Sequence, residues 1–289
     1  MEIKKESCAA AKAAAWDHDL NRREAVIGNL RDNVPQAGIG AAAPRTPVLE
    51  GFMDMYHGVG IVYEDNHLLV VVKPLNMPTQ ADASGDPDLH STMKQYIAEK
   101  YQKPGAVYLG LVHRLDRPVG GLVVLARTSK AADRLSEQVR KKTLARQYVA
   151  AVRGNAKETA ELNDWLLKDE KTNTVRAVSA STPGAKDAKL VYQKAGEKGE
   201  LSLLRVKLFT GRSHQIRVQL SHSGCPIWGD ARYGNGKPGE QIALWGAHLG
   251  MVHPTKKEEM HFTVLPPRDK MPWRGFDEEV WENEAEIVL

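Results

Sequence analysis

The sequence predicts a globular protein that contains both strands and helices. Hydrophobic residues make up 42% of the 289 positions and charged residues 26%, which is typical of a soluble protein. Apolar runs bounded by turn-forming residues predict strands, as at 67–72, and apolar residues at helical spacing predict helices, as at 90–101. The length suits one large domain or two of ordinary size.

Charge and cysteine content narrow the class of protein. Forty Lys and Arg against 36 Asp and Glu give a net charge of +4, which does not by itself predict nucleic-acid binding. Cys8 and Cys225 are the only cysteines, so we expect no disulfide framework and no cysteine zinc site. A reducing compartment fits, and we expect a cytoplasmic protein. The sequence has no run of 18 apolar residues and no secretory pattern at 1–19, so neither a membrane span nor a signal peptide is expected.

Residues 1–58 differ in character from the rest of the chain. Residues 7–16 predict a short alanine-rich helix, and residues 33–48 carry three prolines among clusters of small residues. This composition predicts an extended linker or wrapping arm. We therefore divide the chain into an N-terminal extension, 1–58, and a folded domain, 59–289.

Residues 60–73 predict two strands joined by a turn at 64–66. The second strand, 67–72, is nearly all apolar, as expected for a strand that is buried on both faces. Lys73 follows where the chain leaves the sheet. This lysine is a candidate for a phosphate contact, and a solvated strand end is an equally acceptable interpretation.

Helices are expected at 90–101, which provides core contacts, and from the N-cap Ser129 to about Lys142. The end of the second helix is rich in cations, which suits the helix dipole and makes a phosphate contact a candidate role. These cations are Arg140, Lys141, Lys142 and the nearby Arg146. Strands follow at 145–154 and 201–209, and residues 163–195 predict a meander whose strands flank a turn at 182–185.

One acid, Asp116, lies between Arg114 and Arg117 in the stretch GLVHRLDRPVGGLVVLART, residues 110–128. Apolar segments precede and follow it, so Asp116 is expected in a loop between two extended segments. Loops held by a rigid scaffold often carry catalytic residues. Arginines favour the charged form of a carboxylate, which is then suited to act as a nucleophile or base. A surface salt bridge is the other interpretation of these residues alone.

The stretch TGRSHQIRVQLSHSGCPIWGDARYG, residues 210–234, predicts a helix that Ser213 caps and Gly224 ends. Its first turn carries three basic side chains: Arg212, His214 and Arg217. Cations at a helix N-terminus oppose the dipole, so these residues are expected to face an acid or a phosphate. His214 and His222 have no third ligand nearby in the sequence, and no metal site is expected.

Several stretches together resemble the RluA-type RNA pseudouridine synthases, over residues 60–273. HRLDRPVGGLVVLART is similar to HRLDxxxSGLLLxAKT, with Gly120 where Ser or Thr is usual. RQYVAAVRG is similar to KxYxAxVxG, with Arg146 in place of lysine, and GRSHQIR continues into a match with GRTHQIRVHLxxxGxPIxGDxxYG. KPLNMPTQ resembles KPxGxPxx, and Trp245-Gly246 departs from a Leu-His pair.

The resemblance implies an α+β fold, the pseudouridine synthase catalytic fold: a mixed, largely antiparallel sheet with flanking helices and a central active-site cleft. It implies that Asp116 is catalytic, that Arg217 is its basic partner, with Arg212 as the alternative, and that Tyr148 packs against the target base. We expect the remaining candidates to contact the substrate: Lys73, His113, Arg114, Arg117, Arg146, Arg212 and His214. Residues 1–58 do not resemble the RNA-binding domain that many family members carry.

The implied function is isomerisation of specific uridines in ribosomal or transfer RNA to pseudouridine. No cofactor is expected, because one bond is exchanged for another within a single nucleotide. We expect RNA as the partner, no membrane and a monomer. A catalytically inactive RNA-binding or RNA chaperone protein is the alternative. A glycosidase-type hydrolase would need two carboxylates that flank the bond, and the motifs supply one.

Overall fold

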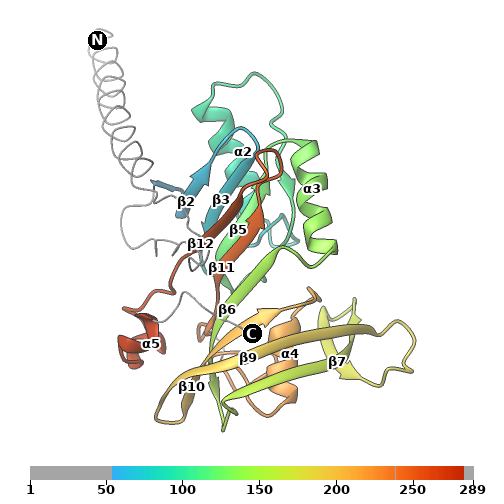
Figure 1. Ribbon diagram of the computed structural model, residues 1–289, viewed down its shortest axis with the longest axis vertical. Coiled ribbons are helices and arrows are strands. Elements are labelled where there is room, and N and C mark those ends of the chain that lie inside the picture. Colours follow the sequence, from blue (N-terminus) through green and yellow to red (C-terminus); the bar gives the residue numbers. More distant parts are fainter. Residues whose placement is uncertain (1–53, 238, 283–289) are drawn as a thin grey trace, which may run out of the picture. The chain divides into compact units, whose positions relative to one another are not determined.

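The computed structural model of this protein describes residues 54–237 and 239–282 (Figure 1). The helix expected at 7–16 and the arm expected at 33–48 lie outside these residues. β1 begins at Asp54 and pairs with β2, so the last residues of the segment assigned to the extension belong to the sheet.

A mixed, mostly antiparallel sheet organises the described residues, as the α+β prediction requires. Its twelve strands are β1 (Asp54–Tyr56), β2 (Val59–Glu64), β3 (Leu68–Lys73), β4 (Gly110–Leu111), β5 (Gly120–Ala126), β6 (Ala145–Arg153), β7 (Thr159–Asp169), β8 (Thr174–Val178), β9 (Lys186–Lys198), β10 (Leu201–Leu208), β11 (Leu244–Val252) and β12 (Glu259–Thr263). Neighbours run β1-β2-β3-β5-β11-β6-β10-β9-β7-β8, with β12 beside β11 and β4 beside β5. The pair of β5 and β11 is parallel.

One half of the sheet forms a core that is covered on both faces. Every residue of β3 and of β5 is buried, as predicted for the apolar run at 67–72. The helices α2 (Leu89–Lys100) and α3 (Ser129–Arg140) belong to this half in Figure 1. Met93 and Ile97 of α2 and Leu135 of α3 are fully or almost fully buried. This rigid half carries the loop that contains Asp116.

The other half of the sheet consists of β6 to β10, with α4 (Gln215–His222) packed against β7 and β8. The predicted meander at 163–195 is wrong in its order, because β7 lies between β8 and β9. β7 is long enough for both partners: residues 159–166 pair with β9, and residues 165–169 pair with β8. The two strands that flank the 182–185 turn therefore do not pair with each other.

The helix starts differ from the predicted caps. Thr128, one residue before the predicted Ser129, caps α3, since its hydroxyl accepts a backbone N–H at 3.2 Å. The Ser213 cap is wrong, because His214 is the residue that precedes α4 and its left-handed backbone (φ 51°) turns the chain into the helix. Gly224 follows the end of α4 with φ 84°, as predicted for a terminating glycine.

Two departures from the family motifs contact each other where β5 meets β11. Gly120 lies opposite Trp245, and Gly121 lies opposite Gly246. A Cβ at Gly120 would come within 2.3 Å of the Trp245 ring, and a Cβ at Gly121 would come within 2.3 Å of the Gly246 carbonyl oxygen. The large indole requires a residue without a side chain at position 120. The two departures therefore compensate each other.

Candidate active site

Asp116 lies in the loop between β4 and β5, as predicted, and its side chain is 27% exposed. The loop is held from both sides. The Thr79 hydroxyl donates to the Leu115 carbonyl at 2.7 Å and accepts the Leu115 N–H at 3.3 Å. The Val119 N–H donates to the Asp116 carbonyl at 3.0 Å. The backbone of the catalytic candidate is thus fixed before any substrate arrives.

Arg217 lies between two carboxylates. Its Nη1 is 3.2 Å from Oδ2 of Asp116, while Nε and Nη2 donate to Asp230 at 2.8 and 2.9 Å. Asp230 is 1% exposed and also accepts the backbone N–H groups of Arg232 and Tyr233 at 3.0 and 3.1 Å. The buried fork fixes the guanidinium, and the guanidinium in turn fixes the Asp116 side chain.

The electrostatics of Arg217 and Asp230 support a true ion pair. Burial lowers the pKa of Arg217, but the hydrogen bonds and negative charges of Asp230 and Asp116 together outweigh burial, and the pKa is raised. Burial raises the pKa of Asp230, but the hydrogen bonds and charge of Arg217 and the backbone N–H groups of Arg232 and Tyr233 together outweigh burial, and the pKa is lowered. Both groups are therefore charged in the folded protein. Breaking one partner of such a buried pair leaves an uncompensated charge.

His214, the residue that precedes α4, approaches the same oxygen of Asp116. Its Nε2 is 4.0 Å from Oδ2, and its Nδ1 is 2.6 Å from the Tyr233 hydroxyl. The Tyr233 oxygen also accepts the Val175 N–H at 2.9 Å. A proton on Nε2 of His214 faces the Asp116 carboxylate, and Nδ1 then accepts the proton of the Tyr233 hydroxyl. Burial lowers the pKa of His214, although the Asp116 carboxylate acts in the opposite direction.

Lys73 has a different role from the expected phosphate contact. Its side chain is completely buried, and Nζ donates to the carbonyls of Pro74, Met77 and Arg117 at 2.9, 2.7 and 3.1 Å. Burial lowers the pKa of Lys73 to about 7, although the Asp116 carboxylate acts in the opposite direction. Three carbonyls match the three protons of the ammonium form and favour it. Lys73 thus ties the segment after β3 to the Asp116 loop and has no donor left for phosphate.

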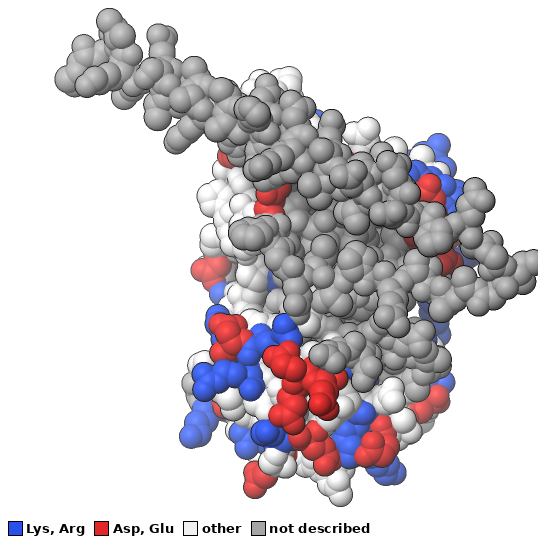
Figure 2. Space-filling view, turned by 60° about the vertical axis from the view of Figure 1, so that its left-hand side comes forward, with Lys and Arg blue, Asp and Glu red and all other residues white. Residues whose placement is uncertain are grey.

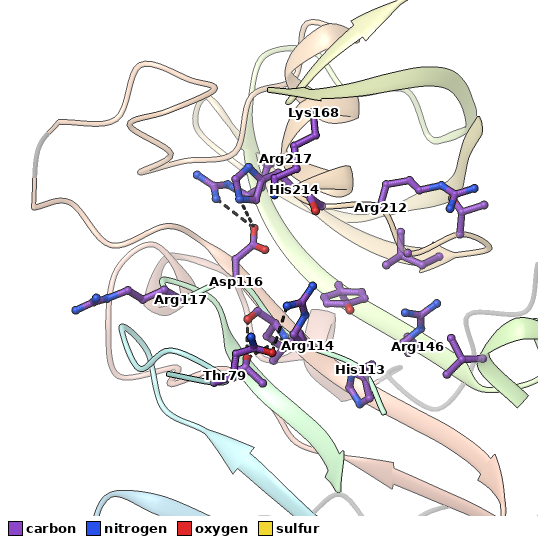
Figure 3. A pocket seen from close by; sticks show the side chains of 18 of the residues that line it. Thr79, His113, Arg114, Asp116, Arg117, Arg146, Lys168, Arg212, His214 and Arg217 are labelled. Carbon is purple, nitrogen blue, oxygen red and sulfur yellow. Dashed lines mark hydrogen bonds and ion pairs between the residues drawn. The ribbon is translucent and has the colours of Figure 1, made fainter. Parts of the chain in front are cut away.

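A cleft of about 970 Å³ includes Asp116 in its lining (Figure 3). Nine cationic side chains line it: Arg114, Arg117, Arg140, Lys142, Arg146, Lys168, Arg212, Arg217 and Arg232. The lining contains two carboxylates, Asp82 and Asp116. By contrast, acidic and basic side chains lie next to one another on the face drawn in Figure 2. The positive charge is concentrated in the cleft, although the net charge of the chain is only +4.

The cleft cations divide into paired and unpaired groups. Arg117 points away from Asp116 in Figure 3 and forms ion pairs with Asp82 and Asp86. Arg212 pairs with Asp187 at 2.7 Å, which removes it as the alternative partner of Asp116. Lys168 and Arg217 also have carboxylate partners. Within residues 54–237 and 239–282, no ion pair forms at five of the lining cations: Arg114, Arg140, Lys142, Arg146 and Arg232.

Tyr148, Arg146 and His113 line a second part of the cleft. Tyr148 lies on β6, is 7% exposed, and its hydroxyl makes no hydrogen bond to the described residues. Burial raises the pKa of Tyr148. A neutral aromatic ring at a cleft wall is the kind of surface on which an unstacked base packs.

Three residues of this site are not predicted from the sequence. Asp230 and Tyr233 were present in the matched GDARYG stretch, yet nothing local marked them as partners of Arg217 and His214. Thr79 lies in KPLNMPTQ and was not singled out. An acid and a tyrosine after a helix whose start carries basic residues would have been the available signal. In the described ranges, no cluster of three or more His, Cys, Asp or Glu side chains could hold a metal ion.

Comparison with known proteins shows which family this chain resembles. A family model described as RNA pseudouridylate synthase matches residues 67–222. Ribosomal large subunit pseudouridine synthase C of Vibrio cholerae is 32% identical, covering 84% of this chain and 75% of that protein. An uncharacterized RNA pseudouridine synthase of Bacillus subtilis is 35% identical, covering 70% of this chain and 67% of that protein.

Two further matches extend the comparison. The mitochondrial tRNA pseudouridine(32) synthase of Saccharomyces cerevisiae is 32% identical, covering 66% of this chain and 39% of that protein. The solved structure of human RNA pseudouridylate synthase domain containing 4 has the same fold, with a TM-score of 0.61 at 21% identity. That match covers 73% of this chain and 89% of the human one.

The fold and the sequence matches define an isomerase that converts uridine in RNA to pseudouridine. The chain belongs to the RNA pseudouridylate synthase family, among its RluA-type members. RNA is accordingly its partner. Of the helices in the described residues, none is long and apolar enough to cross a membrane.

Proposed function

We propose that this chain isomerises specific uridines in ribosomal or transfer RNA, with Asp116 as the catalytic residue. The single observation that carries the proposal is the Asp116 carboxylate, held by Arg217 at 3.2 Å within a cleft whose lining is mostly cationic. Asp82, the other carboxylate of the lining, lies 3.8 Å from Arg117 and is 44% exposed. Relatives named for the large ribosomal subunit and for tRNA supply the two substrate classes.

We propose different tasks for the two oxygens of Asp116. Arg217 Nη1 and His214 Nε2 both approach Oδ2. Oδ1 accepts no hydrogen bond from the described side chains or backbone, and we assign it to the substrate. An ionised carboxylate has three routes at this point: attack on the anomeric sugar carbon, attack on the base ring, or removal of the 2′ proton. Arg217 acts as a positioning residue in each of them.

The target base must leave its stack to reach Asp116, which costs a few kcal/mol. That cost falls in loops and bulges, where RNA is usually read by proteins. We propose that Tyr148 packs on the flipped base and offsets part of the cost. Arg114, Arg146 and His214 remain candidates for contact with the RNA at the cleft. Arg117 and Arg212 keep this role only if RNA displaces Asp86 or Asp187.

The test uses RNA that carries tritium at carbon 5 of uracil. The new carbon–carbon bond expels that hydrogen, so isomerisation releases label to water without free uracil. Separate pools of transfer RNA and ribosomal RNA show which class is the substrate. Free uracil would indicate a hydrolase. If folded protein that binds both pools releases no label from either, the proposal fails and an RNA-binding or chaperone role replaces it.

A further inference from the structure

Two neighbouring donor groups in the wall of the cleft have no acceptor. They are Nδ1 of His113 and Nε of Arg146, both buried and without a hydrogen-bond partner in the described part of the chain. His113 is 8% exposed, and both residues line the cleft. Buried donors without an acceptor are rare because each costs about 1–3 kcal/mol. Such a pair at a binding cleft indicates that a ligand supplies the acceptor.

The protonation of His113 follows from its other nitrogen. Nε2 accepts the Val124 N–H at 3.2 Å, so the proton of the neutral ring lies on Nδ1. Burial lowers the pKa of His113 to about 3, and the nearby Arg146 charge acts in the same direction. The ring is therefore neutral at physiological pH. His113 presents an uncharged N–H next to the Arg146 cation.

Arg146 is held in place without being paired. A Cβ at Gly211 would lie 2.9 Å from Nη1 and 3.4 Å from Nη2, so the guanidinium lies directly on the Gly211 backbone. None of its nitrogens donates a hydrogen bond to residues 54–237 or 239–282. A planar guanidinium presents paired donors that match phosphate oxygens, which the lysine of the family motif does not. The Arg146 guanidinium is thus oriented to bind an anion, and the described residues supply none.

The neighbouring residues favour a phosphate over an uncharged acceptor. Arg140 and Lys142, at the end of α3, line the same cleft and have no carboxylate partner among the described residues. A base carbonyl would satisfy hydrogen bonds but would leave three positive charges uncompensated. Arg146 and Tyr148 are two positions apart on β6 and both face the cleft, which places their Cα atoms about 6–7 Å apart. That separation matches the distance from a base to its own backbone phosphate.

We infer that Arg146 and His113 form a subsite for one of the two phosphates that flank the target nucleotide. The inference rests on the proposed function, because it takes Tyr148 as the platform for the target base. Arg146 supplies the charge and two donors, and His113 supplies the neutral Nδ1–H donor. Gly211 provides the flat surface that keeps the guanidinium in position.

The experiment measures binding in the Asp116→Asn background, so that no RNA is consumed. The probe is an oligoribonucleotide that carries the uridine identified in the tritium assay. Two further oligonucleotides each replace one flanking phosphate, 5′ or 3′ of that uridine, with an uncharged methylphosphonate. Loss of the contacted phosphate should weaken binding about tenfold. The other methylphosphonate should have a much smaller effect, which tells the two phosphates apart.

Arg146→Gln should weaken binding of the unmodified RNA by a similar factor and should no longer distinguish the three oligonucleotides. The salt dependence of RNA binding by Arg146→Gln, −d log K/d log [salt], should be smaller than that of the parent by about 0.7 with single-stranded RNA. His113→Gln keeps an acceptor for the Val124 N–H and removes the Nδ1–H, and it should reduce the methylphosphonate effect. Arg146→Lys should keep the salt dependence, because the charge remains.

Arg153→Gln is the matched control, because Arg153 ends the same strand, is exposed and does not line the cleft. It should bind as the parent does. The inference is overturned if Arg146→Gln discriminates among the oligonucleotides as the parent does, or if Arg146→Lys loses the salt dependence. Unchanged discrimination in His113→Gln would refute the two-donor subsite. Salt dependence on bulk transfer RNA can be read even without turnover, so failure of the proposed function would show separately, in the tritium assay.

Discussion

Two parts of one cleft differ in whether their arginines have carboxylate partners. At Asp116, the guanidinium of Arg217 lies between two carboxylates, and the buried Asp230 accepts four hydrogen bonds. Beside Tyr148, Arg146 has no acceptor in the described residues, although it lies partly buried against Gly211. The first part is complete without a ligand, and the second part is not.

This difference separates the residues that prepare the chemistry from those that recognise RNA. Matched charges fix a geometry, so loss of Arg217, which joins the buried Asp230 to Asp116, should affect both turnover and the fold. Unmatched cations contribute nothing to the fold through ion pairs, so their loss should affect binding and its salt dependence. In the sequence the two groups look alike, because both are basic residues in family motifs. The predictions below test the division, beginning with the largest expected effect.

Replacing Asp116 with Asn should abolish turnover while RNA binding and thermal stability remain. The change keeps the shape of the side chain and removes the charge that every route requires. Asp82→Asn is the matched control, since Asp82 is the other carboxylate in the lining. Single-turnover tritium release measures both variants. Activity of the Asp116 variant within about tenfold of the parent, a barrier change near 1.4 kcal/mol, would remove it from the mechanism.

Arg217→Met should reduce turnover by orders of magnitude and destabilise the fold by about 3–5 kcal/mol, because Asp230 would remain buried and unpaired. The double variant Arg217→Met with Asp230→Asn removes both charges. It should regain much of the stability, measured by urea denaturation, but not the activity. If the double variant recovers both stability and activity, Arg217 stabilises the fold only, and its ion pair with Asp230 has no role in catalysis.

Tyr148→Ala should weaken binding to RNA that carries the target uridine by about 1–3 kcal/mol, the usual value of one base stacked on an aromatic ring. Tyr148→Phe should bind as the parent does, since the hydroxyl makes no hydrogen bond to the described residues. Titration in the Asp116→Asn background measures both. Equal affinity of the Ala variant and the parent would make Tyr148 a core residue. It would also weaken the argument that Arg146 lies beside the site of the target base.

The sequence predicted those parts of the site that depend on neighbouring residues. The loop position of Asp116, the strand pair on either side of 64–66 and the end of α4 at Gly224 all follow from neighbouring residues. The motif resemblance supplied Arg217, which lies 101 positions from Asp116. A local reading would have favoured Arg117, which is adjacent in sequence yet pairs with Asp86.

The rest depended on contacts that no local pattern records. Lys73 follows an apolar strand and resembled a solvated strand end, but carbonyls from two loops enclose its ammonium group. The order of β8, β7 and β9 was missed because β7 uses both of its edges. Asp230 was missed because its role exists only when α4 brings Arg217 beside it.

The smallest effect per pH unit concerns acid stability at His113, the buried neighbour of Arg146. The pKa of His113 is about 3 in the folded protein, against about 6.5 in an unfolded chain. The unfolded state therefore binds a proton that the folded state excludes, and the free energy of unfolding falls as pH drops below about 6.5. In His113→Gln, unfolding no longer takes up this proton. The free energy of unfolding should therefore change less steeply with pH, by about 1 kcal/mol per pH unit between pH 6 and 4. His248, whose pKa burial lowers to about 4, keeps its own share of the slope and gives the internal reference. Urea unfolding at a series of pH values measures the slopes, and identical slopes in parent and variant would mean that the ring beside Arg146 accepts a proton in the folded state.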